Sequence, residues 1–182
     1  MVFDHSQRTT EEQARKNRKM KYNREALIDQ LILHEGMELQ VYKDHLGIDT
    51  IGVGRNLEDR GITDGELAFM NMLKAEVYEQ GITETHARFL LSNDIDIVEK
   101  ELVASHPCTV GLDDVRCRVL LDMAINLGMP RLNKFKNMWK AIHDRDFDSA
   151  SREMLDSRWA TQVGQRSVRL SEAMKTGELV CQ

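Results

Sequence analysis

The chain has 182 residues, of which 41% are hydrophobic and 30% charged, and its formal net charge is −5. This length can bury a sizeable core within one domain, and the acidic balance is not the basic footprint of a dedicated nucleic-acid binder. No apolar run approaches the roughly 18 residues that span a bilayer, so we expect no stable membrane insertion. The polar N-terminus has no apolar segment of the secretory-signal kind.

Charge is distributed unevenly along the chain. Residues 1–24 hold seven Lys and Arg against three Asp and Glu, residues 25–110 hold six against seventeen, and residues 111–182 hold twelve against ten. Because residues 1–22 also lack apolar periodicity, they are predicted to be a polar basic extension ahead of a domain over 23–182.

The three cysteines are Cys108, Cys117 and Cys181. They form no CxxC motif and cannot all pair within one chain, so reduced thiols are expected. A disulfide between Cys108 and Cys117 stays open as an alternative.

In chain order, the first predicted helix begins after Asn23, a good N-cap residue, and runs to Glu35, where Gly36 ends it. Residues 39–57 then change period. Strand formers alternate there with glycines, which predicts a small antiparallel hairpin or three-stranded sheet.

Further helices follow this sheet. The capping-box sequence Thr63-Asp64-Gly65-Glu66 predicts a helix over about 64–79, which Gly81 ends. Thr83 begins a long helix of about 84–105 that stops before Pro107.

From Gly111 onward the chain is predicted to be entirely helical. A helix begins at Asp113 or Asp114 and ends at Gly128, and others cover about 132–143, 147–156 and 165–175. Trp139 and Trp159 are interpreted as core anchors. The predicted fold is therefore α+β and mainly α: a small α+β lobe (23–83), a connecting helix (84–106) and a helical lobe (107–182), with a ligand cleft between the lobes.

Three side chains suggest a chemistry. Glu35 ends an apolar helix, where partial burial would help it keep a proton, and Asp44 and Thr50 follow on an extended, glycine-spaced stretch. Taken singly, they are explained as a solvated glutamate, a turn aspartate and an ordinary strand residue. Taken together, they suit glycoside hydrolysis, which needs two carboxyl groups in unlike environments.

The segment from His34 to Gly54 resembles the active-site segment of phage-type lysozymes, the endolysins and tail lysozymes of glycoside hydrolase family twenty-four. The shared pattern is Glu-Gly at 35–36, Tyr-x-Asp at 42–44, a glycine turn at 47, and Thr-x-Gly-x-Gly at 50–54. Weaker similarity continues to about residue 178, including Ala124–Gly128 and a Trp159-then-Arg166 motif.

This resemblance implies a lysozyme-like fold and a catalytic set of Glu35 as general acid, with Asp44 and Thr50 positioning and activating the water. The residues expected to bind substrate are Gly54, Asn56, Asn126, Gln162 and Arg166. Arg166 is also a candidate ion-pair partner of Glu35. Two departures from the family pattern are Arg55, where a histidine is common, which predicts a differently built ion pair, and Ile125, where an aromatic is expected.

The implied function is an endolysin-like muramidase that cleaves the β-1,4 bond between N-acetylmuramic acid and N-acetylglucosamine. No cofactor and no metal are expected, bacterial peptidoglycan is the partner, and the protein is expected to be a monomer. It would be made in the host cytoplasm and act on the periplasmic wall after release, or be carried in the virion. The alternatives are a virion-associated, wall-penetrating or wall-binding protein with weak catalysis, and a glycosidase for another aminosugar polymer such as chitin.

Overall fold

The computed structural model describes residues 19–179. The described residues divide into two compact units, one of residues 23–97 and one of residues 19–22 and 98–179. Most of the predicted basic extension, and Cys181, lie outside the described residues. Each unit is described by itself below.

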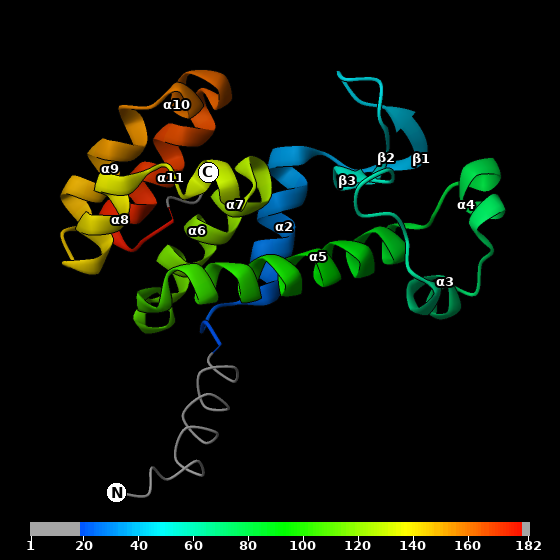
Figure 1. Ribbon diagram of the computed structural model, residues 1–182, viewed down its shortest axis with the longest axis horizontal. Helices are drawn as coiled ribbons and strands as arrows, with labels where there is room; N and C mark the ends of the chain where they lie inside the picture. Colours follow the sequence, from blue (N-terminus) through cyan, green and yellow to red (C-terminus); the bar gives the residue numbers. More distant parts are fainter. Residues whose placement is uncertain (1–18, 180–182) are drawn as a thin grey trace, which may run out of the picture. The chain divides into compact units, whose positions relative to one another are not determined.

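The first unit, called here the small unit, contains helix α2 (Arg24–Glu35) and an antiparallel sheet of strand order β1-β2-β3 (Figure 1). Tyr42 on β1 pairs with Thr50 on β2, which pairs in turn with Asn56 on β3. The remaining elements are given by their bounds: β1 (Glu38–Lys43), β2 (Asp49–Gly52), β3 (Arg55–Asn56), α3 (Asp64–Met70), α4 (Lys74–Gln80) and the first part of α5 (Glu84–Ser105).

One face of the sheet closes the core of the small unit. Ile51 is fully buried, and because side chains alternate along a strand it points away from the face that carries Thr50. Apolar side chains of α3, α4 and α5 pack on that side. The buried members of this core are Ile51, Leu57, Met70, Val77, Ile82, Ala87 and Leu90.

The second unit, called here the helical unit, is centred on α6 (Asp114–Leu127), eight of whose residues are buried. Helices α9 and α11 pack on each other, with α8 against α9 and α11 against α6 (Figure 1). Trp139 and Trp159 are buried, which confirms their prediction as core residues. The other elements are η1 (Pro107–Gly111), α7 (Met129–Leu132), α8 (Lys136–His143), α9 (Phe147–Leu155), α10 (Arg158–Val163) and α11 (Gln165–Thr176).

The mainly helical α+β fold class is confirmed, and so are most predicted helix ends. Asn23 caps α2 by accepting a hydrogen bond from the Ala26 amide at 3.1 Å, and Thr63 and Glu66 form the predicted capping box. Gly36 and Gly81 end their helices with positive φ angles of 79° and 74°. These ends follow from local chemistry that the sequence displays directly.

Two predicted helices are wrong in extent. The helix expected over 64–79 is two helices, because Asn71 takes a left-handed conformation (φ 51°) that ends α3. The helix expected over 132–143 begins only at Lys136 and is preceded by the short α7. Helix α10, capped by the Ser157 hydroxyl, was not predicted.

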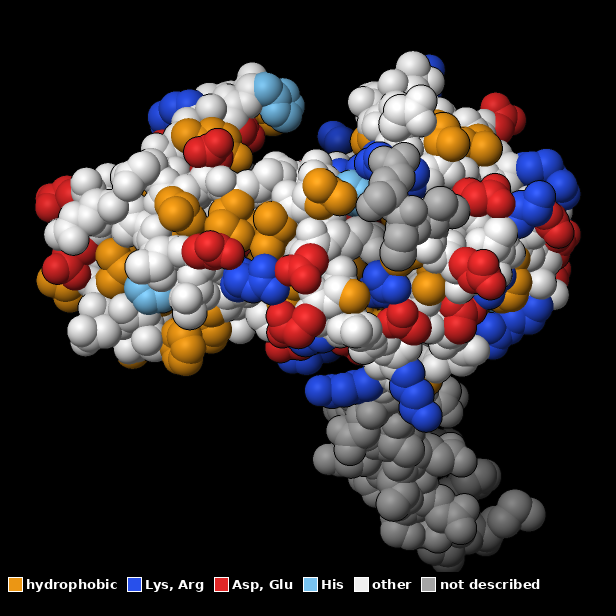
Figure 2. Space-filling model, turned by 180° about the vertical axis from the view of Figure 1, so that it is seen from behind, with side chains coloured by type: hydrophobic (Ala, Val, Ile, Leu, Met, Phe, Trp, Pro, Cys, Tyr) orange, Lys and Arg blue, Asp and Glu red, His pale blue; other side chains and the backbone are white. Residues whose placement is uncertain are grey.

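The surface carries charges of both signs among smaller hydrophobic areas, as Figure 2 shows for one face. Large hydrophobic side chains with substantial exposure include Leu33, Phe69 and Leu73. No helix within residues 19–179 is both long enough and apolar enough to cross a membrane.

Cys108 and Cys117 are both free thiols, so the alternative of a disulfide between them is wrong. Cys117 is completely buried, and this burial raises the pKa of its thiol to about 12. A thiol with so high a pKa is not a nucleophile near neutral pH.

Candidate active site

Glu35 is the last residue of α2 and its side chain is exposed. It lies one turn beyond Leu31, which is fully buried on the same helical face. The expectation of a partly buried carboxyl is therefore wrong, because the buried residues of α2 end at Leu31, one turn before Glu35. Gly36 then turns the chain toward β1.

Asp44 lies at the end of β1, in the turn toward β2. Its Oδ1 accepts hydrogen bonds from the amides of Leu46 at 2.8 Å and Ile48 at 2.9 Å. The Ile48 hydrogen bond is the main reason that the pKa of this carboxyl lies below its ordinary value, with the Leu46 amide adding to the effect. The turn interpretation of Asp44 is thus confirmed, and the same turn fixes the carboxylate in place while leaving Oδ2 outside these two bonds.

Thr50, on β2, is 4% exposed. Its hydroxyl donates to the Ile48 carbonyl at 3.1 Å, so one carbonyl and amide pair, that of Ile48, orients both Thr50 and Asp44. Asp44 and Thr50 are therefore tied to the same residue of the β1–β2 turn.

Tyr42 on β1 is influenced by the carboxyl groups of Glu35 and Asp44. The sequence assigned Tyr42 no role beyond its place in the family pattern. Burial raises the pKa of the Tyr42 phenol first, and the nearby carboxylates of Glu38, Asp44 and Glu35 raise it further. The predicted acid and the predicted water-activating carboxylate therefore both belong to the small unit and both act electrostatically on Tyr42.

The β2–β3 hairpin presents the predicted substrate residues Gly54 and Asn56. Gly54 has a positive φ of 71°, and a Cβ at this position would meet nothing within 4 Å. The backbone there is therefore open to close approach. The Asn56 side-chain oxygen accepts from the amides of Glu58 and Asp59, both at 2.8 Å, which gives Asn56 a structural task beside the predicted one.

In place of the family's frequent histidine, Arg55 forms a buried ion pair with Glu66 at 2.8 Å and another with Asp94 at 3.3 Å. Arg55 therefore forms ion pairs at this position, and the prediction that they are built differently from those of the family stays a prediction.

The helical unit holds the other predicted binding residues. Trp159 donates its indole N–H to Asn126 at 2.9 Å, and Arg166 forms a buried ion pair with Asp122 at 2.7 Å. Gln162 is exposed. Pairing of Arg166 with Glu35 stays a prediction, as do the substrate roles of these three residues.

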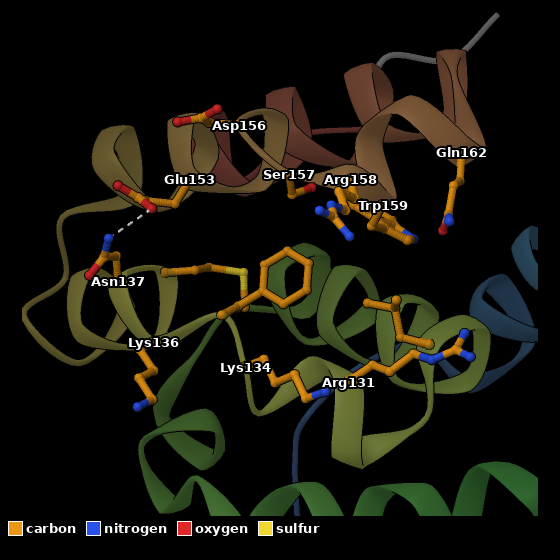
Figure 3. Close-up of a pocket in the computed structure, with 13 residues that line it drawn as sticks. Arg131, Lys134, Lys136, Asn137, Glu153, Asp156, Ser157, Arg158, Trp159 and Gln162 are labelled. Atoms are coloured by element: carbon orange, nitrogen blue, oxygen red, sulfur yellow. Dashed lines mark hydrogen bonds between the residues drawn. The ribbon is translucent and has the colours of Figure 1, made fainter.

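A groove of about 760 Å³ lies beside Trp159 and Gln162 in the helical unit (Figure 3). Its basic side chains come from the α7–α8 segment on one side and from α10 on the other, with Glu153 and Asp156 as the acidic ones. The four basic residues are Arg131, Lys134, Lys136 and Arg158. Sequence reasoning missed this groove, and its only trace in the sequence is the excess of Lys and Arg after residue 111.

A mainly helical α+β fold with a small three-stranded antiparallel sheet fits a lysozyme-like protein. The chain belongs to the phage lysozyme family, whose sequence model matches residues 33–173. This membership supports a muramidase-like function with peptidoglycan as substrate.

Similar proteins fit this assignment. Probable T4-type lysozymes 2 and 1 of Dictyostelium discoideum are 29% and 27% identical to the chain, over 85% and 83% of its length and 96% and 94% of theirs. The pre-baseplate central spike protein Gp5 of Enterobacteria phage T4 is 26% identical over 85% of the chain, which corresponds to 28% of that protein.

Proposed function

We propose that the chain is a muramidase that hydrolyses the β-1,4 bond between N-acetylmuramic acid and N-acetylglucosamine. Glu35 donates a proton to the glycosidic oxygen, and a water held by Asp44 and Thr50 attacks the anomeric carbon. The observation that carries the proposal is the β1–β2 turn of a chain of the phage lysozyme family, where the Ile48 amide holds Asp44 Oδ1 and the Ile48 carbonyl accepts the Thr50 hydroxyl.

The reaction balances without any further group. The C–O bond to the leaving sugar breaks as Glu35 protonates that oxygen, the water oxygen forms the new bond, and Asp44 accepts the proton that the water loses. Acid and base catalysis each contribute roughly 10²–10⁴-fold. Attack by a water on the opposite face gives inversion, for which the two carboxyl groups stand roughly 6.5–9.5 Å apart.

Residues of both units bind the polymer in this proposal. Gly54 and Asn56 contact it in the small unit, and Asn126, Gln162 and Arg166 in the helical unit. The carboxylates of the peptide chains on muramic acid suit the basic groove beside Gln162, since Arg and Lys there outnumber the acidic residues. Neither a metal nor a cofactor takes part.

The decisive comparison is Glu35→Gln against Glu38→Gln. Both changes neutralise one exposed carboxyl of the small unit, and the Tyr42 phenol feels both groups. On purified peptidoglycan, Glu35→Gln should release at least roughly 10²-fold fewer reducing ends, whereas Glu38→Gln should act like the wild type. Wild-type activity in Glu35→Gln would refute the acid assignment. Mass analysis of the fragments separates hydrolysis from a transglycosylase, which yields anhydro-sugars, and chitin serves as the competing substrate.

For the biological role, we propose that the protein is a phage endolysin that is made in the host cytoplasm and acts as a monomer. It reaches the periplasmic cell wall and causes lysis of the host. The similarity to a phage spike protein favours a second candidate, a lysozyme carried in the virion. Mass spectrometry of purified particles and of the cleared lysate separates them. An endolysin remains in the lysate, and a virion lysozyme sediments with the particles in a fixed ratio to structural proteins.

A further inference from the structure

Arg55 is an unusual residue for the place it occupies. It lies on β3, only 5% exposed, and its two terminal nitrogens reach different helices. Nη1 bonds to Glu66 of α3 at 2.8 Å, and Nη2 lies 3.3 Å from Asp94 of α5. One side chain therefore ties the last strand of the sheet to two helices of the small unit.

The two acidic partners of Arg55 are held differently, Glu66 by hydrogen bonds and Asp94 by ion pairs. Glu66 Oε2 accepts from the amide and the hydroxyl of Thr63, at 2.8 and 3.0 Å, and its Oε1 accepts from Asn93 at 2.9 Å. Burial alone would raise the pKa of Glu66, but these hydrogen bonds and Arg55 lower it on balance. Asp94 also lies 3.5 Å from Arg60. The guanidinium of Arg55 is thus hydrogen-bonded to a carboxylate with little freedom of its own, Glu66. Its contact with Asp94 is an ion pair only, because the buried Asp94 Oδ1 accepts no hydrogen bond among the described residues.

Arg55 can transmit this rigidity to the site through two strand pairs. Strand β3 is only two residues long, and Arg55 pairs with Ile51 while Asn56 pairs with Thr50. Because side chains alternate along strands, Arg55 and Ile51 belong to the face packed on the helices, and Thr50 and Asn56 to the other face. A strand of two residues has few ladder hydrogen bonds, so its position depends on such side-chain attachments.

Stability alone is a weak reason for a buried network of this kind. Replacing a buried ion pair by apolar side chains of similar volume is often neutral or stabilising, since desolvation offsets the Coulombic gain. A guanidinium fixed in this way instead determines the position of the strand that carries it.

We propose that Arg55 is a positioning residue of the hydrolytic reaction: paired with Glu66 and Asp94, it holds the β2–β3 hairpin so that Thr50 keeps the geometry that water attack requires. This inference rests on the proposed function of Thr50. Arg55 itself touches no reacting atom. Loss of the Arg55 side chain should displace Thr50 by up to about one ångström. A displacement of this size should lower the rate of hydrolysis roughly 10–100-fold.

The test uses the full chain and three variants of the network. Arg55→Met removes the guanidinium and leaves both acidic partners in place. Arg55→Lys keeps the positive charge but has a single ammonium group, which cannot contact both carboxylates as the planar guanidinium does. Arg55→Met/Glu66→Gln/Asp94→Asn removes all three charges together. Activity is measured on peptidoglycan at temperatures well below each variant's unfolding midpoint. We expect the triple variant to be folded and yet to lose roughly 10–100-fold in kcat with KM changed less than about threefold, and Arg55→Lys to fall between. Wild-type kcat in the folded triple variant would overturn the inference.

Arg88→Met is the matched control. Arg88 also joins two elements of the small unit through two carboxylates, Glu25 at 3.0 Å and Asp29 at 2.8 Å, but its pairs lie on the surface and do not involve the hairpin. Its removal should leave kcat unchanged.

Hydrogen exchange separates failure of this inference from failure of the proposed function. The Leu57 amide bonds to the Asp49 carbonyl at 2.8 Å and reports on the hairpin without any substrate. It should exchange faster in the Arg55 variants than in the wild type or in Arg88→Met. Unchanged exchange refutes the clamp whatever the activity. Faster exchange in a protein whose wild type does not cleave peptidoglycan refutes the muramidase assignment and leaves the clamp standing.

Discussion

At the scale of single residues, the β1–β2 turn makes one aspartate both a structural and a chemical group. The amides of Ile48 and Leu46 hold Asp44 Oδ1 and favour its charged form. An ordinary turn aspartate would do no more than this. Here the Thr50 hydroxyl is bound to the same Ile48 residue, so the turn also sets the distance between the two groups that are proposed to hold the water.

The lowered pKa of Asp44 predicts how this turn responds to acid. Because the pKa in the folded chain lies below the unfolded value of about 3.9, the stability that Asp44 contributes is present above that pH. It is lost as the pH falls through the lower folded value. In an NMR titration, the amide shifts of Leu46 and Ile48 should stay constant from pH 7 to about 5 and move only in stronger acid. Asp44→Asn should abolish that movement, and a midpoint above the ordinary aspartate value would contradict the prediction.

Thr50 offers a second test at the residue scale. Thr50→Val keeps the shape but removes the hydroxyl, and the Ile48 carbonyl keeps its other hydrogen bond from the Asp44 amide. The free energy of unfolding should therefore fall by about 1 kcal/mol or less, while kcat falls roughly 10²-fold. Thr50→Ser, which keeps the hydroxyl, is the control and should retain most of the activity. Equal activity of the valine and serine variants would exclude a role for the hydroxyl.

At the scale of elements, the end of α4 lies against β1 at Gly81. Gly81 has a φ of 74°, and a Cβ there would lie 2.3 Å from the Leu39 carbonyl oxygen. The next amide, that of Ile82, donates to the same carbonyl at 2.8 Å. This contact fixes β1, the strand that leads into Asp44. A side chain at position 81 would therefore push against β1 and move the β1–β2 turn.

Gly81→Ala should therefore destabilise the chain by roughly 2–4 kcal/mol, through the clash and the left-handed backbone together. Gly65→Ala is the matched control, because Gly65 lies within α3 with no heavy atom within 4 Å of the added Cβ. That change should be neutral or stabilising by about 0.5–1 kcal/mol. Chemical denaturation monitored by circular dichroism measures both, and a Gly81→Ala cost as small as that of Gly65→Ala would contradict the prediction.

Elements whose ends depend on local chemistry were predictable, and those that depend on tertiary contacts were not. Asn23, Thr63 and Gly81 mark helix ends that any sequence of this kind would show. By contrast, only the folded chain shows that Asn71 breaks a helix whose sequence could continue. The exposure of Glu35 is a similar case, because the apolar pattern of α2 continues to it while the core does not.

The candidate site divides in the same way. The proposed catalytic set could be named from the sequence because its members lie within 16 residues and match a family pattern, and its roles stay predictions. The Arg55 network and the basic groove could not, since Glu66 and Asp94 lie far along the chain from Arg55, and the groove joins α7–α8 to α10. Such groups are brought together by tertiary packing alone.

At the scale of the whole molecule, the chain passes from the helical unit into the small unit and back again. Residues 20–22 belong with the helical unit, although α2 of the small unit follows them directly. Glu99, which is 8% exposed on α5, accepts hydrogen bonds from the Met20 amide at 2.9 Å and the Tyr22 hydroxyl at 3.0 Å. This contact closes the helical unit across a span of nearly eighty residues of sequence.

Glu99→Gln should therefore weaken the helical unit. The amide cannot accept at both positions, and hydrogen bonds to a charged acceptor contribute about 1.5–3 kcal/mol each, so a loss of roughly 1–3 kcal/mol is expected. Both tryptophans of the chain, Trp139 and Trp159, lie in the helical unit, so fluorescence during denaturation reports on that unit. Glu101→Gln, an exposed change on the same helix, is the control and should not shift the midpoint. If both variants unfold at the wild-type midpoint, the hydrogen bonds of Glu99 to Met20 and Tyr22 do not stabilise the helical unit.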